Sequence, residues 1–385
     1  MYKKNSTTFL DGLRGIAAFQ VLVGHLRALT WEGYQVGFLQ HPELYSTLDK
    51  LMMYFFSLFR YGHQMVIFFF ILSGFVIHLK YANSLKEGKR NFDYKEYLLK
   101  RVKRIYPVWI FVMLLALVID NIGILLELPI YGNLPKYPLV DAMVYYDHSW
   151  QVFIGNLFFL QTLWVKIWGT TVPVWSLVLE WWFYMLYPLL WFAIRKSILL
   201  ATSIVIVLYV LVTWLPPGFL GLLEPLRNVF LTFPMWWLGV LLADAYVERL
   251  KITLLIFAPF SLLLPMAVLP NSLWLKVGLT INLDFLQADL TWALGFMGLI
   301  ALLFIMQSKG LSLKLLEKLQ PLGDISYSLY IVHYPIAVFI GGLVLLLGNG
   351  IYPTHSWYLL ISTLVILPIC YLVHLFVEKP FIKRK

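Results

Sequence analysis

Long apolar stretches fill most of this sequence and restrict its fold more than any other feature. A helix needs about 20 mostly apolar residues to cross the hydrocarbon core of a bilayer. Helices can span that core because each one satisfies its own backbone hydrogen bonds there. Stretches of about this length lie near residues 10–29, 63–80, 105–126, 174–194, 198–215, 228–247, 252–269, 286–306, 325–347 and 357–378. They predict an all-α integral membrane protein with about ten transmembrane helices.

Composition excludes the soluble classes of protein. Hydrophobic residues make up 61 % of the 385-residue chain, and charged residues make up only 13 %. A soluble domain typically carries about 25 % charged residues. The single cysteine, Cys370, excludes an internal disulfide and any cysteine-based metal cluster. We therefore expect residues 1–385 to form one transmembrane domain with no soluble domain beside it.

The distribution of basic residues predicts the orientation of the chain. With a cytoplasmic N-terminus and ten crossings, 22 of the 30 Lys and Arg residues lie inside, 6 lie outside and 2 belong to the first span. Cytoplasmic loops of membrane proteins are enriched in Lys and Arg. This bias explains the net charge of +10 without a nucleic-acid partner and predicts that both termini are cytoplasmic. The apolar segment 151–163 is too short to cross, and we expect it to be re-entrant or interfacial.

Two ionisable residues share one face of the first predicted span. Arg14 and His25 are eleven residues apart. At 100° per residue this separation is three turns plus about 20°, or roughly 16 Å along the helix axis. An ionisable residue inside a membrane span indicates function by default. The alternative is an arginine that snorkels to the interface and a histidine that only packs.

The fourth predicted span carries a second polar pair. Ser176 and Glu180 are four residues apart and therefore share a helix face. In the predicted orientation, Glu180 and His25 both lie in the outer half of the membrane. A carboxylate and an imidazole at similar depth form a candidate acid–base pair. The alternative is that Glu180 forms an ion pair with an arginine elsewhere in the bundle.

A cytoplasmic basic run precedes the third predicted span. It contains Lys100, Arg101, Lys103 and Arg104, with Tyr106 close behind. Composition alone favours a juxtamembrane patch that binds anionic headgroups of membrane lipids. The alternative is a site for a phosphate-rich cofactor, because guanidinium groups match phosphate geometry.

The remaining histidines are weaker candidates. His333 lies in a late span and His63 at the outer mouth of the second span, whereas His78 and His374 lie near span ends and are interpreted as interfacial. The pair Ser73-Gly74 indicates close helix packing. No metal-binding spacing of His, Cys or acidic residues occurs, so we expect no metal site.

Six segments carry a further signal. In chain order they read FLDGLRGIAAFQVLVGH, GHQMVIFFFILSGFVI, KRVKRIYP, NLFFLQTL, WSLVLEWWFY and SYSLYIVHYP. Together they resemble the membrane acyltransferase-3 family, from about residue 9 to residue 378. Members of that family are bacterial inner-membrane proteins that acylate, and most often O-acetylate, cell-surface glycans. This chain resembles the form that lacks a C-terminal periplasmic esterase-like domain.

The resemblance implies roles for the polar residues. It implies catalytic roles for His25, Glu180 and Arg14. It implies acyl-CoA binding, with acetyl-CoA as the default donor, by Arg14, Arg101, Lys103 and Arg104. Residues assigned to substrate binding or support are Ser176, His333, His63 and Tyr106. Whether His25 acts as a base or carries the acyl group as an acyl-imidazole stays open.

The implied partners are acyl-CoA, membrane lipids and an acceptor that is a surface glycan or a lipid-linked saccharide. The implied location is the bacterial inner membrane, with several crossings and both termini in the cytoplasm. The alternative function is a polytopic transporter of a small solute or a glycan precursor, because intramembrane charges also mark substrate pathways.

Overall fold

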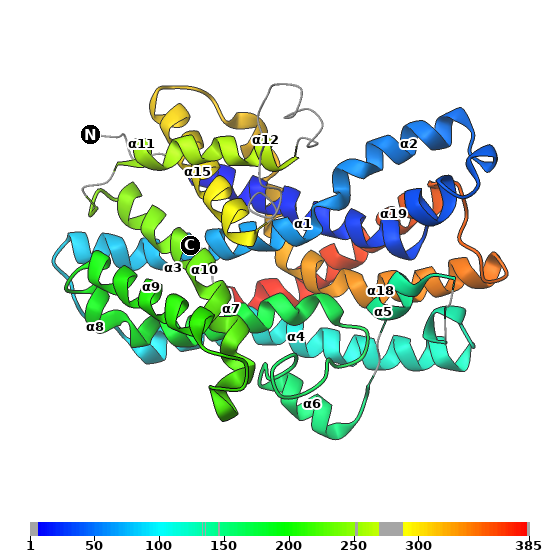
Figure 1. Cartoon of the computed structure of the whole chain (residues 1–385), viewed down its shortest axis with the longest axis horizontal. Coiled ribbons are helices and arrows are strands. Elements are labelled where there is room, and N and C mark those ends of the chain that lie inside the picture. The colour runs from blue at the N-terminus through cyan, green and yellow to red at the C-terminus, as the bar shows by residue number, and fades with distance from the viewer. Residues whose placement is uncertain are drawn as a thin grey trace. The chain divides into compact units, whose positions relative to one another are not determined.

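The computed structural model describes residues 7–132, 134, 136–144, 147–250, 253–268 and 288–382. These residues form helices joined by turns and loops (Figure 1). They divide into two compact units, each assembled from separate parts of the sequence. The first unit comprises residues 1–14, 63–94 and 179–320, and the second comprises 15–62, 95–178 and 321–385. Helices α1 (Thr8–Leu29) and α7 (Trp175–Leu189) each contribute residues to both units.

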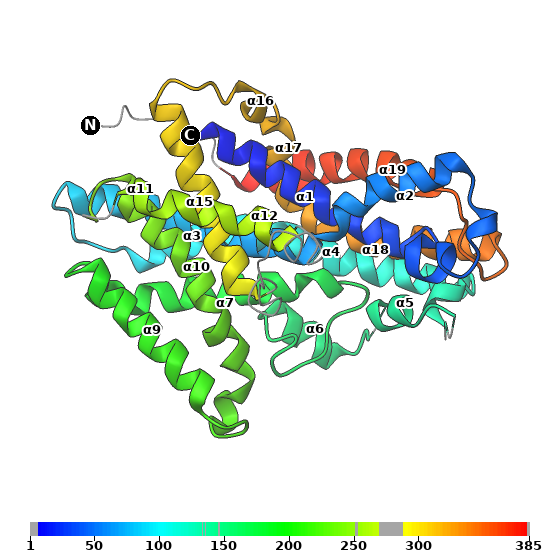
Figure 2. The same ribbon diagram turned by 45° about the horizontal axis from the view of Figure 1, so that its top comes forward.

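The first unit is organised around three long helices and a helical hairpin. The long helices are α3 (Gly62–Lys86), α10 (Arg227–Tyr246) and α15 (Asp289–Ser308). Helix α9 (Ile198–Trp214) packs along α10, and Figure 2 shows the two as a hairpin. The shorter helices are α8 (Trp191–Ile194), α11 (Leu254–Phe257) and α12 (Leu263–Val268), of which the last two pack on α15.

Two glycines allow α3 and α10 to touch. A Cβ atom at Gly74 would lie 2.1 Å from the backbone oxygen of Trp236, and one at Gly239 would lie 2.1 Å from that of Ile71. Any larger residue at either position would therefore push the two backbones apart. Small residues bring membrane helices together in this way. The prediction of close packing at Ser73-Gly74 is confirmed.

The second unit packs around α18 (Ser326–Leu347). Helix α19 (Trp357–Val373) and the short helices η4 (Pro129–Tyr131) and η5 (Val172–Val174) contact it. A Cβ atom at Gly341 would lie 2.3 Å from the backbone oxygen of Leu29, so α18 and the end of α1 are also in close contact. Further helices of this unit include α2 (Thr47–Ser57), α4 (Tyr94–Leu125), α5 (Pro138–Met143) and α6 (Trp150–Leu157).

The prediction of a multi-pass helical membrane protein is confirmed, but the number of crossings is not. Six helical segments of the described residues are long and apolar enough to cross a membrane: 47–86, 94–125, 221–246, 289–308, 326–347 and 357–381. Shorter apolar helices cover 198–214 and 254–268. The predicted spans 252–269 and 286–306 lie partly outside the described residues.

The segment 151–163 does not form a long helix. Helix α6 ends at Leu157 after eight residues. Phe159 and Thr162 then adopt positive φ angles of 56° and 62°, which a continuing helix does not allow. A helix of this length is far too short to cross a bilayer.

Candidate active site

Two histidines from distant parts of the chain form a pair in the second unit. Nδ1 of His25 on α1 lies 2.9 Å from Nε2 of His333 on α18. The two ring planes are nearly parallel, with centroids 5.1 Å apart and an angle of 16° between the planes. The His333 side chain is fully buried, whereas His25 is partly exposed.

The partners of His333 fix the proton positions in this pair. Nδ1 of His333 lies 2.7 Å from the carbonyl oxygen of Leu329, which can only accept a hydrogen bond. Nδ1 of His333 therefore carries a proton, and Nε2 of the neutral ring is an acceptor. His25 then donates from its own Nδ1, which leaves a lone pair on its Nε2. In this arrangement, the lone pair on Nε2 of His25 is one that could accept a proton.

Tyr334 holds the His25 ring from a second side. Its ring meets that of His25 edge to face, with centroids 4.9 Å apart and an angle of 80°. Tyr334 is itself 1 % exposed, so surrounding side chains fix its position. His25 is thus oriented by one hydrogen bond and by aromatic contacts.

Ser176 lies close to the same stretch of α18. Its Oγ is 2.7 Å from the hydroxyl of Tyr330, which also donates to the backbone oxygen of Pro173 at 3.1 Å. Tyr330 precedes His333 by three residues, and their ring centroids are 6.3 Å apart. Sequence reasoning missed Tyr330, although its spacing of three from His333 places both on one helix face.

Glu180 lies on α7 in the first unit, where Tyr184 donates a hydrogen bond to its carboxylate. The predicted pairing of Glu180 with His25 stays a prediction. Arg14, also in the first unit, forms an ion pair with Asp11 at 3.2 Å, and 28 % of its side chain is exposed. His63 pairs with Asp289 at 2.9 Å, and both side chains are well exposed.

Arg104 from the basic run forms an ion pair inside the second unit. Its Nη1 lies 2.6 Å from Oε1 of Glu378, whose side chain is 1 % exposed. The guanidinium group also lies over the ring of Tyr327, 5.2 Å from the centroid. Arg104 is thus held in one orientation, with 32 % of its side chain exposed.

Glu378 is a residue that sequence reasoning missed. The hydroxyl of Ser328 donates to its Oε2 at 2.5 Å, and Nδ1 of His374 lies 2.9 Å from the same atom. Only 13 % of the His374 side chain is exposed, and it faces Glu378; its predicted position at the membrane interface stays a prediction. A glutamate four residues after a histidine at the end of an apolar stretch was the available signal.

The other members of the basic run differ in their surroundings. Lys100 forms an ion pair with Glu96 one turn away, and the guanidinium of Arg101 lies over Tyr97 at 5.8 Å. Lys103 is exposed. Tyr106 packs edge to face on Phe159, with ring centroids 5.5 Å apart. Arg104 is held by a buried counter-ion, whereas Lys103 projects into the surroundings.

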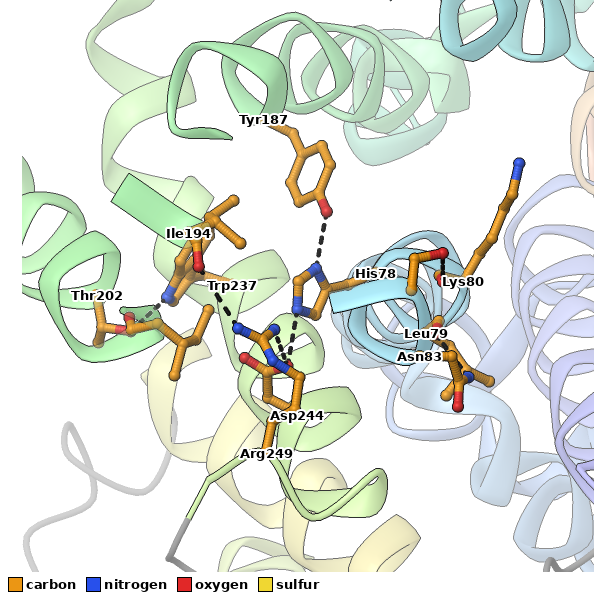
Figure 3. A network of polar contacts seen from close by, with 12 residues as sticks. His78, Leu79, Lys80, Asn83, Tyr187, Ile194, Thr202, Trp237, Asp244 and Arg249 are labelled. Atoms are coloured by element: carbon orange, nitrogen blue, oxygen red, sulfur yellow. Dashed lines mark hydrogen bonds and ion pairs between the residues drawn. The ribbon is translucent and has the colours of Figure 1, made fainter. Parts of the chain in front are cut away.

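His78 belongs to a buried polar network in the first unit, and its predicted position at the membrane interface stays a prediction. Figure 3 shows its ring between Tyr187 and Asp244. Nδ1 lies 2.7 Å from the Tyr187 hydroxyl, and Nε2 lies 3.2 Å from Oδ1 of Asp244. Arg249 donates to the same carboxylate oxygen at 2.6 Å. A fully buried carboxylate requires such partners, because desolvation of an unpaired charge is costly.

Within the part of the chain that the structure describes, no group of three or more His, Cys, Asp or Glu side chains could hold a metal ion. A family model described as an acyltransferase domain, Acyl_transf_3, matches residues 7–375, which is nearly the whole chain. No curated protein and no solved structure matches the chain.

Proposed function

The chain belongs to the acyltransferase-3 family, and from this premise we propose that it transfers a short acyl group from cytoplasmic acyl-CoA to a glycan hydroxyl. Acetyl-CoA is the proposed donor. The proposed acceptor is a lipid-linked saccharide or a cell-surface glycan. The proposed location is the bacterial inner membrane, with both termini in the cytoplasm, as the bias of basic residues favours.

The observation that carries this proposal is which ring nitrogens of His25 and His333 carry protons. Ester formation from a thioester needs a base for the incoming hydroxyl. In the proposed reaction, Nε2 of His25 takes the hydroxyl proton while the hydroxyl oxygen attacks the thioester carbonyl. The carbon–sulfur bond then breaks, and the CoA thiolate receives the proton. The buried His333 keeps the ring of His25 in the tautomer that this step requires.

The same lone pair supports a second route. Nε2 of His25 can attack the thioester itself and form an acyl-imidazole, which the acceptor hydroxyl then cleaves. Both routes develop negative charge on the carbonyl oxygen, which a nearby cation stabilises. Arg14 lies on the same helix face roughly 16 Å from His25, so its proposed part is to guide the acyl arm along that face toward His25. Glu180 is proposed to balance or orient His25.

The proposed binding site for the phosphates of acyl-CoA includes Arg101, Lys103 and Arg104. Arg104 supports this assignment because Glu378 and Tyr327 fix the direction of its guanidinium group while leaving a third of its side chain exposed. A preorganised guanidinium loses little freedom when it binds phosphate. Ser176, Tyr106 and His63 are proposed to support the substrates.

Measuring the acetyl esters on the surface glycan of the host tests the proposed function. Mass spectrometry would compare the wild type, the gene deletion, and deletions complemented with wild-type, His25→Ala or His41→Ala protein. His41 is an exposed histidine in a loop and serves as the matched control. We expect base-labile acetyl esters to disappear in the deletion and to return with the wild type and with His41→Ala, but not with His25→Ala. Full activity of His25→Ala would overturn its assignment.

The transporter alternative requires a separate measurement. Purified protein in nanodiscs would be incubated with labelled acetyl-CoA and glycan extracted from the deletion strain. Label transferred to the glycan supports the acyltransferase. Solute movement across proteoliposomes without any dependence on acetyl-CoA would favour the transporter.

A further inference from the structure

A chain of hydrogen bonds in the first unit ends on Glu180. The indole Nε1 of Trp236 on α10 donates to Oγ of Ser73 on α3 at 3.1 Å. Oγ of Ser73 lies 3.0 Å from the hydroxyl of Tyr184 on α7. The Tyr184 hydroxyl in turn donates to Oε1 of Glu180, one turn earlier on the same helix. Three helices thus contribute to a single line of polar groups.

The groups at the two ends of this series of hydrogen bonds determine which group donates in each bond. An indole N–H can only donate, and an ionised carboxylate can only accept. Tyr184 uses its one proton on Glu180 and must therefore accept from Ser73. Ser73 accepts from Trp236 and gives its own proton to Tyr184. Every group between the indole and the carboxylate consequently has one allowed orientation.

The helix packing keeps these groups at bonding distance. Gly74 follows Ser73, and the lack of a side chain there lets α3 approach the backbone of Trp236. The Trp236 side chain is fully buried and stacks on Phe233 at 5.6 Å with an angle of 15°. Its N–H direction is therefore set by packing. Tyr184 is 6 % exposed, so its hydroxyl is also confined.

We propose that Trp236, Ser73 and Tyr184 are positioning residues that hold the carboxylate of Glu180 in one orientation for acyl transfer. This inference rests on the proposed function and on the role of Glu180 in it. The chain does not act as a proton relay, because it terminates in an indole N–H that does not give up its proton. Its effect is to remove the rotational freedom of the Glu180 carboxylate before substrates arrive, which lowers the cost of reaching the reactive geometry.

The neighbouring Trp237 provides a matched control. It is also buried, at 2 % exposure, and its indole N–H also donates a hydrogen bond, at 2.9 Å. Its acceptor is Thr202 on α9 (Figure 3), and no hydrogen bond of the chain to Glu180 involves Thr202. Trp236→Phe and Trp237→Phe therefore remove the same group from adjacent buried sites, and only the first breaks the line to Glu180.

The test measures acetyl transfer by purified full-length protein in nanodiscs, with kcat and the KM for acetyl-CoA determined separately. We expect Trp236→Phe and Ser73→Ala to lower kcat by about 3- to 10-fold, in line with the loss of one hydrogen bond, and to leave KM unchanged. Ser73→Thr, which keeps the hydroxyl, should restore kcat. Trp237→Phe should retain wild-type kcat. Thermal unfolding in detergent would be recorded for every variant to detect general destabilisation.

A double variant adds a check on the connection. Tyr184→Phe breaks the last link, so adding Trp236→Phe to it should lower kcat no further. Equal loss of kcat in Trp236→Phe and Trp237→Phe, failure of Ser73→Thr to restore kcat, or additive losses in the double variant would each overturn the proposal. Absence of acetyl transfer by the wild type is a different outcome, because it would overturn the proposed function itself and this inference with it.

Discussion

Nδ1 of His25 lies 2.9 Å from Nε2 of His333, although 308 positions separate the two residues in the sequence. The second ring nitrogen of His333 is bound to a backbone carbonyl. In the proposed mechanism, His333 plays the part that a carboxylate plays in many catalytic triads, since it would set the tautomer and the direction of the ring proposed to act as base. Unlike a carboxylate, it adds no negative charge to a membrane-embedded site.

His333→Ala should lower kcat strongly without removing the base. His25 would lose the acceptor for its Nδ1 proton, and its ring would no longer be confined to one tautomer. We expect a loss of about 10- to 100-fold, smaller than the roughly 10²- to 10⁴-fold loss expected for His25→Ala. His333→Gln keeps an acceptor oxygen and should recover part of the loss. Acetyl transfer assays on the three variants would measure this order, and equal rates for His333→Ala and the wild type would contradict it.

Arg104→Ala should destabilise the protein because it leaves the buried carboxylate of Glu378 without its arginine. Breaking a buried ion pair by removing one partner typically costs about 3–5 kcal/mol. Because 32 % of the Arg104 side chain is exposed, we expect a smaller cost of about 1–3 kcal/mol. The double variant Arg104→Ala/Glu378→Gln should be more stable than Arg104→Ala alone. Unfolding midpoints in detergent would measure the difference, and a double variant less stable than Arg104→Ala would argue against the ion pair.

Gly74→Ala should separate α3 from α10. The new Cβ atom would lie 2.1 Å from the backbone oxygen of Trp236, so the helices must shift. Overpacking of this kind costs about 1–3 kcal/mol. Gly62→Ala is the control, because the nearest atom to a Cβ there is 4.0 Å away. Thermal unfolding would compare the two variants, and equal midpoints would show that the close approach at Gly74 contributes nothing.

Alkaline pH should weaken the contacts of Tyr137, which lies outside the membrane-spanning segments. Burial and the nearby Glu32 raise the pKa of Tyr137 to about 12. Its hydroxyl donates to Glu32 at 3.1 Å and accepts from the backbone N–H of Tyr352 at 3.0 Å. Between its unfolded pKa of about 10 and the raised value, the folded state binds more protons than the unfolded state, so stability falls as pH rises through this window.

Unfolding midpoints at pH 8, 9, 10 and 11 would test this dependence, with Tyr137→Phe as the comparison. The variant lacks the phenol and should lose less stability above about pH 10 than the wild type does. Parallel curves for the two proteins would assign the alkaline loss to other groups.

Two properties of this protein follow from its amino-acid sequence alone: it is a helical membrane protein, and particular polar residues interrupt its apolar helices. The reason is physical: about 20 apolar residues in succession have few stable alternatives to a spanning helix, and a charge among them is expensive enough to indicate a role. The close approach of α3 to α10 at Gly74 was also predictable, because a small residue inside a span lets a neighbouring helix come close. The six sequence segments, in their order along the chain, also indicated the family.

The partners of these polar residues, in contrast, depend on how the helices pack. Local spacing links residues three or four apart, so it cannot connect His25 to His333, Arg104 to Glu378 or Glu180 to Trp236. The acid that faces His78 lies on another helix and could not be predicted from spacing, whereas the acid that faces His374 is four residues later in the sequence. Periodicity determines the face on which a side chain lies, but the packing of helices determines what that face meets.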